Sequence, residues 1–166
     1  MRVLGLDPSS QSTGYGLIDD RSGEYVLLGR GAIKPGRHQA LEFRLNAIRE
    51  GVDKLIVEHG PEEVAIENPF YSRNIRTAIT LGQVRGAVLV AVASRSIPLY
   101  EYSALEIKKA VTGYGQADKL QVNAMVRALL HLGEEAVEED AADALATAIC
   151  HINSRAFHKT VEGSGL

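Results

Sequence analysis

Two acidic residues each end a short apolar segment of the sequence. Asp7 follows Val3-Leu-Gly-Leu6, and Glu67 follows Val64-Ala-Ile66. Such segments are typical of buried β-strands, and parallel neighbouring strands place their carboxyl ends at one edge of a sheet. Two carboxylates held together there repel each other unless a cation lies between them. The pair therefore predicts a cation site, although each acid could instead cap the turn after its strand, as Asp7-Pro8-Ser9 would.

A second pair of acids lies in the segment Asp140-Ala-Ala-Asp143. The i, i+3 spacing puts both carboxylates on one face of a helix, and the alanines allow that helix to approach a sheet closely. In the structural alternative, Asp140 is an N-cap and Asp143 is favoured by the helix dipole. If the two pairs of acids meet, their oxygens form a site for Mg²⁺, with Mn²⁺ as a substitute. Two such ions can clamp a scissile phosphate, one activating a water and the other stabilising the leaving oxygen.

Other catalytic motifs are absent from the sequence. It contains no G-x-S-x-G elbow, no Walker A loop and no HExxH motif. The single Cys, Cys150, excludes a disulfide framework and is expected in the core. Of the five histidines, His151 lies about two helical turns past Asp143, so we expect it to support the site or to pack rather than to act as a base.

The periodicity of the apolar residues predicts an α/β fold. Three strands joined by short turns precede alternating helices and strands, which favours a mixed five-stranded sheet flanked by helices, with strands one, four and five parallel. We expect strands at 3–7, 15–18, 25–33, 64–67 and 98–102, and helices from 41 to a stop at Gly60-Pro61, and at 74–94, 103–111, 122–130 and 140–155. Ser103 and Glu106 have the spacing of a capping box. One domain is expected at 1–157, followed by a frayed tail at 158–166.

Composition and charge narrow the class of protein. The chain has 166 residues, 45% of them hydrophobic, and a net charge of −3. No signal peptide is visible, and the apolar stretch 86–93 is far shorter than the roughly 20 residues of a membrane span; we expect a cytoplasmic protein with no membrane partner. Residues 70–131 hold 8 basic and 3 acidic side chains, whereas residues 132–143 hold six acids and no base. This pattern suits a polyanion held beside metal-filled carboxylates, although ordinary solvated helix faces would also produce it.

Four segments, in order along the chain, resemble the RuvC family of bacterial Holliday-junction resolvases. They are Leu4–Gly16 (LGLDPSSQSTGYG), Ala65–Phe70 (AIENPF), Leu81–Ala87 (LGQVRGA) and Asp140–Ala146 (DAADALA). The resemblance extends from residue 1 to about 155 and implies a ribonuclease H-like fold. It also implies that the catalytic, metal-binding acids are Asp7, Glu67, Asp140 and Asp143, with two Mg²⁺ ions in each active site.

The same resemblance implies DNA contacts. It assigns base stacking to Phe70, and it places Lys108 and Lys119 beside the active site. An exposed ring can stack on an unpaired base, and ammonium groups near helix starts can bind phosphates. A core Phe and solvated lysines are the structural alternatives. Arg73 and Arg76 are expected to contact the DNA backbone.

The sequence departs from the family pattern at two places. The family motif reads Asp-Pro-Gly, and Ser9 takes the place of its glycine here. This difference concerns the tightness of the first turn but not the acids. Pro69 precedes the aromatic residue Phe70 and affects how its ring is presented.

The resemblance implies a Mg²⁺-dependent endonuclease that resolves Holliday junctions by symmetric paired nicks in recombination and DNA repair. It also implies work alongside the RuvA–RuvB branch-migration complex. Because two symmetric cuts need two active sites, we expect a homodimer with the apolar helix 81–92 as its interface, unless that helix is buried under its own sheet. The alternatives are a RuvC-like RNA-processing nuclease and a non-cleaving junction-binding module. An actin-like kinase or ATPase would need a second domain, which 166 residues cannot supply.

Overall fold

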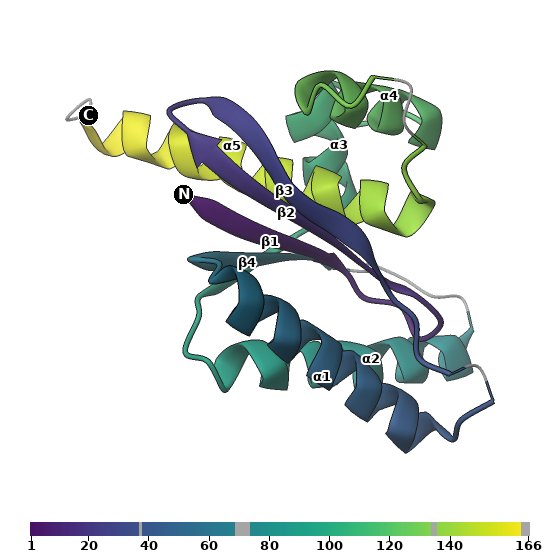
Figure 1. The fold of residues 1–166 in the computed structure, drawn as a ribbon. Coiled ribbons are helices and arrows are strands. Elements are labelled where there is room, and N and C mark those ends of the chain that lie inside the picture. Colours follow the sequence, from purple (N-terminus) through teal and green to yellow (C-terminus); the bar gives the residue numbers. More distant parts are fainter. Residues whose placement is uncertain (37, 69–73, 134–135, 164–166) are drawn as a thin grey trace.

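The computed structural model describes residues 1–36, 38–68, 74–133 and 136–163. These form one five-stranded sheet with the strand order β3-β2-β1-β4-β5. Figure 1 shows helices α1 and α2 on one face of the sheet and α3, α4 and α5 on the other. The predicted mixed sheet flanked by helices is confirmed.

The first three strands form the predicted antiparallel meander. They are β1 (Arg2–Asp7), β2 (Thr13–Arg21) and β3 (Glu24–Ile33). The β2–β3 connection is a two-residue turn in which Ser22 and Gly23 both have positive φ, at 58° and 95°. This geometry matches the twist of paired strands, so the meander is specified locally.

The remaining strands run parallel to β1, as predicted. β4 (Glu63–Glu67) pairs with β1, with Leu6 opposite Ile66, and β5 (Leu99–Tyr102) pairs with β4, with Glu67 opposite Tyr102. Asp7 and Glu67 consequently end neighbouring strands at the carboxyl edge of the sheet.

Helices α1 (Leu41–His59) and α2 (Ile75–Ala93) cover the first face. Leu4 and Leu6 of β1 pack there in a core that includes Ile48 of α1 and Val84 of α2. Gly60 ends α1 in the left-handed conformation, as expected for a glycine stop signal.

The length and composition of α2 would allow it to cross a membrane, in contrast to the expectation that no apolar stretch is long enough. Core helices of globular proteins pass the same test, and Val84, Val88, Ala91 and Val92 of α2 are buried in the core. Ile75, Ile79 and Val90 of the same helix are exposed.

Helices α3 (Ala104–Thr112), α4 (Lys119–Leu129) and α5 (Glu139–Gly163) cover the second face. Ser103 and Glu106 form the predicted capping box, and Asp118 and Gln121 form a second one that the sequence analysis missed. The helix predicted to end at Arg155 continues to Gly163.

Two glycines bring α5 into contact with the sheet. A Cβ at Gly5 would lie 2.1 Å from the Ala144 carbonyl oxygen, and one at Gly14 would lie 2.0 Å from the Asp140 carbonyl oxygen. Both distances are far below van der Waals contact, so only glycine permits this approach. The glycines thereby set the position of the first two turns of α5 relative to β1 and β2.

Candidate active site

Asp7 and Glu67 lie on the same face of the sheet. Val3 of β1 and Ala65 of β4 belong to the core under α5. Side chains alternate between the two faces of a strand, so Asp7, four residues after Val3, and Glu67, two residues after Ala65, also face α5. The strand register and the alternation together place the two carboxylates side by side, as the sequence predicted.

Helix α5 brings the second pair of acids to this edge. The Ala142 amide donates to the Glu138 carbonyl oxygen at 2.9 Å, so the helical hydrogen bonds begin at Glu138 and Asp140 is already inside the helix. The alternative that Asp140 is an N-cap is therefore wrong. Asp143 lies one turn further along, and its side chain is 26% exposed.

The acids are close enough to perturb one another. Burial, and then the charges of Asp143, Glu67 and Asp140 in that order of effect, raise the pKa of Asp7 to about 7, against the opposing effect of Lys119. Burial and then Asp143 also raise the pKa of Glu67. Burial raises the pKa of Asp143, against the opposing effect of Lys119. The site thus holds more negative charge than its surroundings neutralise, which favours a bound cation.

Lys119 stands beside these acids at the start of α4. Its Nζ lies 3.1 Å from Asp143 Oδ2 and also contacts Glu139, and these hydrogen bonds, that to Glu139 first, raise the pKa of Lys119. Lys119 is thus tied to the acids, although 60% of its side chain is exposed to solvent. Lys108 of α3 lines a recess of about 120 Å³ together with Lys119, Glu67 and Asp143. The structure thus brings both predicted lysines to the acids.

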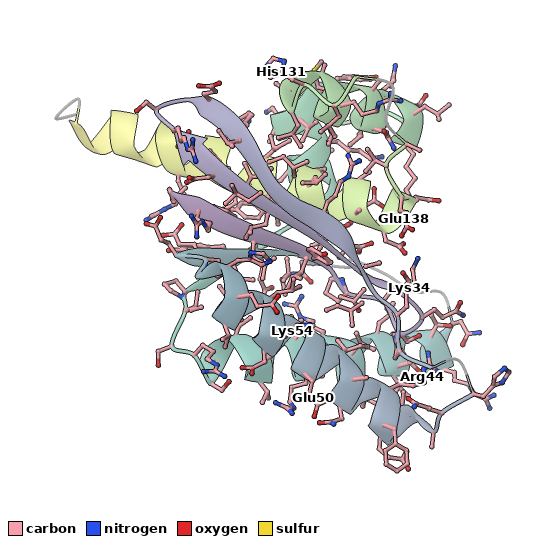
Figure 2. The ribbon with its side chains drawn as sticks, in the orientation of Figure 1. Lys34, Arg44, Glu50, Lys54, His131 and Glu138 are labelled. Atoms are coloured by element: carbon pink, nitrogen blue, oxygen red, sulfur yellow. The ribbon has the colours of Figure 1, made fainter. Side chains whose placement is uncertain are left out.

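Two further cavities open at the same edge. One, of about 300 Å³, is lined by Asp7, Pro8, Ser9, Glu67, Leu81 and Arg85. The other, of about 670 Å³, is a cleft whose lining is rich in hydroxyl and amide groups: Ser9, Ser10, Gln11, Ser12, Lys34, Pro35, Thr77, Thr80, Leu81 and Asp140. The ion pair of Lys34 with Glu138 (Nζ–Oε2 3.0 Å) links the chain after β3 to the start of α5 (Figure 2). The acids therefore stand where an extended ligand could reach them from more than one side.

The donor set fits a hard divalent cation. All four acidic side chains offer carboxylate oxygens, the ligands that Mg²⁺ and Mn²⁺ prefer. Within the part of the chain that the structure describes, however, no three His, Cys, Asp or Glu side chains lie close enough to hold one ion together. The chemistry of the donors and the raised carboxylate pKa values support a metal site, and the detailed ligand geometry stays a prediction.

Of the other predicted contacts, only Arg76 belongs to the described residues. Phe70 and Arg73 fall within 69–73, which the structure does not describe. Arg76 lies in the exposed first turn of α2, where its backbone amide donates to Asn74 Oδ1 at 3.0 Å. At the first turn, Thr13 Oγ1 donates to the Ser9 carbonyl oxygen at 2.8 Å, so Ser9 lies in a turn closed by this bond.

Sequence reasoning missed Arg85, which lies in the cavity with Asp7 and Glu67. The available signal was its place in the motif Leu81–Ala87, but no spacing rule shows which way a helical arginine points. His151 is fully buried, with its Nε2 2.5 Å from Glu63 Oε2 and its Nδ1 2.7 Å from the Tyr102 hydroxyl. Cys150 is buried, as expected.

Comparisons with known proteins find relatives over most of this chain. The family model described as "Crossover junction endodeoxyribonuclease RuvC" matches residues 3–151. The curated RuvC of Geobacter sulfurreducens is 47% identical over 154 residues, covering 93% of each chain. That of Clostridioides difficile is 38% identical over 165 residues, covering 99% of this chain and 98% of its own.

Solved structures give the same result. "T. thermophilus RuvC in complex with Holliday junction substrate" superposes with a TM-score of 0.89 at 33% identity, covering 93% of this chain and 94% of that one. The yeast mitochondrial Holliday junction resolvase Ydc2, at 14% identity and a TM-score of 0.67, shares the fold. The family-model match over residues 3–151, the relatives matched over most of their length and the superposition together show that this chain belongs to the RuvC family of crossover junction endodeoxyribonucleases.

Proposed function

We propose that this chain is a Holliday-junction resolvase that hydrolyses phosphodiester bonds of four-way DNA junctions with the help of divalent metal ions. The observation that carries the proposal is the group of carboxylates Asp7, Glu67 and Asp143 at the carboxyl edge of the sheet, where burial and the charge of Asp143 raise the pKa values of both Asp7 and Glu67. Such a group beside a polyanion weakens binding unless cations neutralise it, so a binding module would not retain it.

Each residue of the site has a chemical role in this proposal. Asp7, Glu67, Asp140 and Asp143 would hold the metal ions, which we take to be two Mg²⁺ per site with Mn²⁺ as a substitute. When bound, such ions supply an activated water and stabilise the leaving 3′ oxygen. Asp7 must be ionised to act as a ligand, so its raised pKa is part of the reaction's pH dependence.

The surrounding side chains would hold the DNA. Lys108 and Lys119 line the recess beside the acids and would bind phosphate oxygens. The hydroxyl-rich cleft offers neutral donors, the kind that contact a DNA backbone without adding charge. Phe70 would stack on a base at the junction, and Arg73 and Arg76 would contact backbone phosphates.

The proposal also includes a homodimer, because paired nicks need two active sites. One face of α2 is buried in the chain's own core, so the opposite face is the candidate interface. That face carries exposed Ile75, Ile79 and Val90, and a Cβ added at Gly82 or Gly86 would meet no neighbouring atom. Exposed apolar residues flanking glycines allow a second helix to approach closely.

The function is tested by incubating the protein with a synthetic four-way junction in Mg²⁺, Mn²⁺ or EDTA, with linear duplex and an RNA hairpin as controls. We expect metal-dependent, symmetric nicks that ligase can seal. Binding without cutting in either metal would favour the junction-binding module, and cutting of the RNA alone would favour an RNA-processing nuclease. Addition of RuvA–RuvB to the junction tests the partnership, which we expect to increase cutting.

The dimer is tested by sedimentation of the wild type and two matched variants. Ile79→Lys places a charge on the exposed face of α2 and should shift the protein from dimer to monomer. Val57→Lys places the same charge at a similarly exposed site on α1, where Val57 is 61% and Ile79 59% exposed, and should leave the dimer intact. A monomeric wild type, or a dimeric Ile79→Lys, would contradict the assigned interface.

A further inference from the structure

Arg85 is a cation that shares a cavity with two of the acids. It projects from α2, on the sheet face opposite the lysines of α3 and α4, and it lines the cavity of about 300 Å³ with Asp7 and Glu67. Lys119 and Lys108 are the cations that lower the pKa of Glu67. The ion-pair partner of Arg85 is Glu101 of β5 rather than either of these carboxylates.

The guanidinium of Arg85 is held in place by one end. Its Nη2 forms an ion pair with Oε1 of Glu101 on β5, and the Arg85 side chain is only 19% exposed. Its Nη1 is buried and has no hydrogen-bond partner among the residues that the structure describes. Burying a charged donor without a hydrogen-bond partner costs free energy, so we expect Nη1 to bind an acceptor that the described residues do not supply.

A DNA phosphate is the acceptor that fits. The planar guanidinium presents several N–H donors in a rigid fork that matches phosphate oxygens, and one arm of the fork is already fixed by Glu101. A phosphodiester held by metal ions at Asp7 and Glu67 would lie beside the same cavity, which both acids line with Arg85. We propose that Arg85 binds a non-bridging phosphate oxygen of the junction strand in this cavity, across the acids from Lys119. This inference rests on the proposed function, because it takes the ligand to be junction DNA.

The test compares Arg85→Gln with Glu101→Gln, which removes the partner of the ion pair and leaves the arginine. Junction binding is measured without metal over a range of salt concentrations, and cutting is measured in Mg²⁺ with protein in excess. For Arg85→Gln we expect binding about ten-fold weaker, a salt-dependence slope smaller by about one, and slower cutting at saturation. For Glu101→Gln we expect the wild-type slope, because the charge of Arg85 is kept. Arg85→Lys should keep the slope but cut more slowly than the wild type, because it keeps the charge and loses the fork.

A purely structural role of Arg85 predicts a different result for the same variants. If Arg85 only ties α2 to β5, the Gln variants at 85 and 101 will lose thermal stability and activity in parallel, and that result would overturn the inference. So would wild-type binding, slope and cutting by Arg85→Gln. The wild-type protein in the same experiments tests the proposed function separately. If it binds the junction without cutting it, the resolvase proposal fails. The salt dependence of junction binding by the variants still tests the role of Arg85.

Discussion

Replacing Gly14 with alanine should damage the active site through the backbone alone. Gly14 pairs with Asp7 across the β1–β2 ladder, and its missing side chain is what lets α5 lie against β2. An alanine Cβ would stand 2.0 Å from the Asp140 carbonyl oxygen, whereas ordinary contact begins at 3.4 Å, so the two must separate by about 1.4 Å. The two nearest atoms, the carbonyl oxygen and the carbonyl carbon of Asp140, both belong to the main chain, so no side-chain rotation relieves the clash.

The expected magnitudes follow from that displacement. Catalytic groups must be held within about 0.5 Å of their productive geometry, and a misplacement of about 1 Å can cost roughly 100-fold in rate. We therefore expect Gly14→Ala to cut junctions at least about 100-fold more slowly. Overpacking of this kind costs about 1–3 kcal/mol of unfolding free energy, so the variant should stay folded at 25 °C.

Single-turnover cutting of a four-way junction and urea unfolding measure the two effects separately. Gly29→Ala is the matched control, because Gly29 also lies in a strand, and a Cβ there would meet no atom within 4 Å. A folded Gly14→Ala that cuts at the wild-type rate would refute the reasoning. Equal losses in Gly29→Ala would show that strand glycines matter for another reason than the approach of α5.

Three further outcomes are expected. Asp7→Asn should abolish cutting yet stabilise the metal-free protein at pH 8. The pKa of Asp7 in the folded state is raised from 3.8 to about 7, so the stability that its protonated form contributes is lost as the pH rises through that range. Urea unfolding in EDTA at pH 5 and 8 measures the effect, and a variant no more stable than the wild type at pH 8 would contradict the reasoning. His151→Ala leaves the buried Glu63 carboxylate without one of its hydrogen-bond partners and should lower the unfolding free energy by about 1–3 kcal/mol. His38→Ala, on the exposed loop before α1, is the control and should not lower it. Equal unfolding free energies of the two variants would contradict a stabilising role of the His151–Glu63 hydrogen bond. Phe70→Ala should slow junction cutting by roughly ten-fold or more while the circular dichroism spectrum is preserved, because base stacking is worth about 1–3 kcal/mol, and unfolding of this variant would instead indicate a core residue.

Local patterns in the sequence were sufficient for the fold. The strand-end acids, the turn before Tyr25 and the Ser103–Glu106 capping box each depend on residues a few positions apart. Such signals act through neighbouring backbone hydrogen bonds and the period of apolar burial, and the predicted element order was correct throughout. Element ends were less well predicted: α5 extends to Gly163 because helical backbone bonds continue past the apolar stripe that ends near Ile152.

The sequence also singled out the four acids as candidate metal ligands, because each can be recognised from the strand or helix in which it lies. What they could not predict is how close the acids lie. That Asp143 and Glu67 both raise the pKa of Asp7 depends on the β1–β4 register and on the contact that Gly5 and Gly14 allow with α5.

The sequence by itself determined the family, the element order and the residue types of the site. Only the tertiary structure decided which face of α2 is free, that His151 bonds to Glu63 from 88 positions away, and that one arm of the Arg85 fork lacks a partner in the described chain. The physical reason is that helix and strand patterns are set by neighbours within one or two turns. The direction of a long side chain, and the groups it meets, are set by the packing of elements that are remote in sequence.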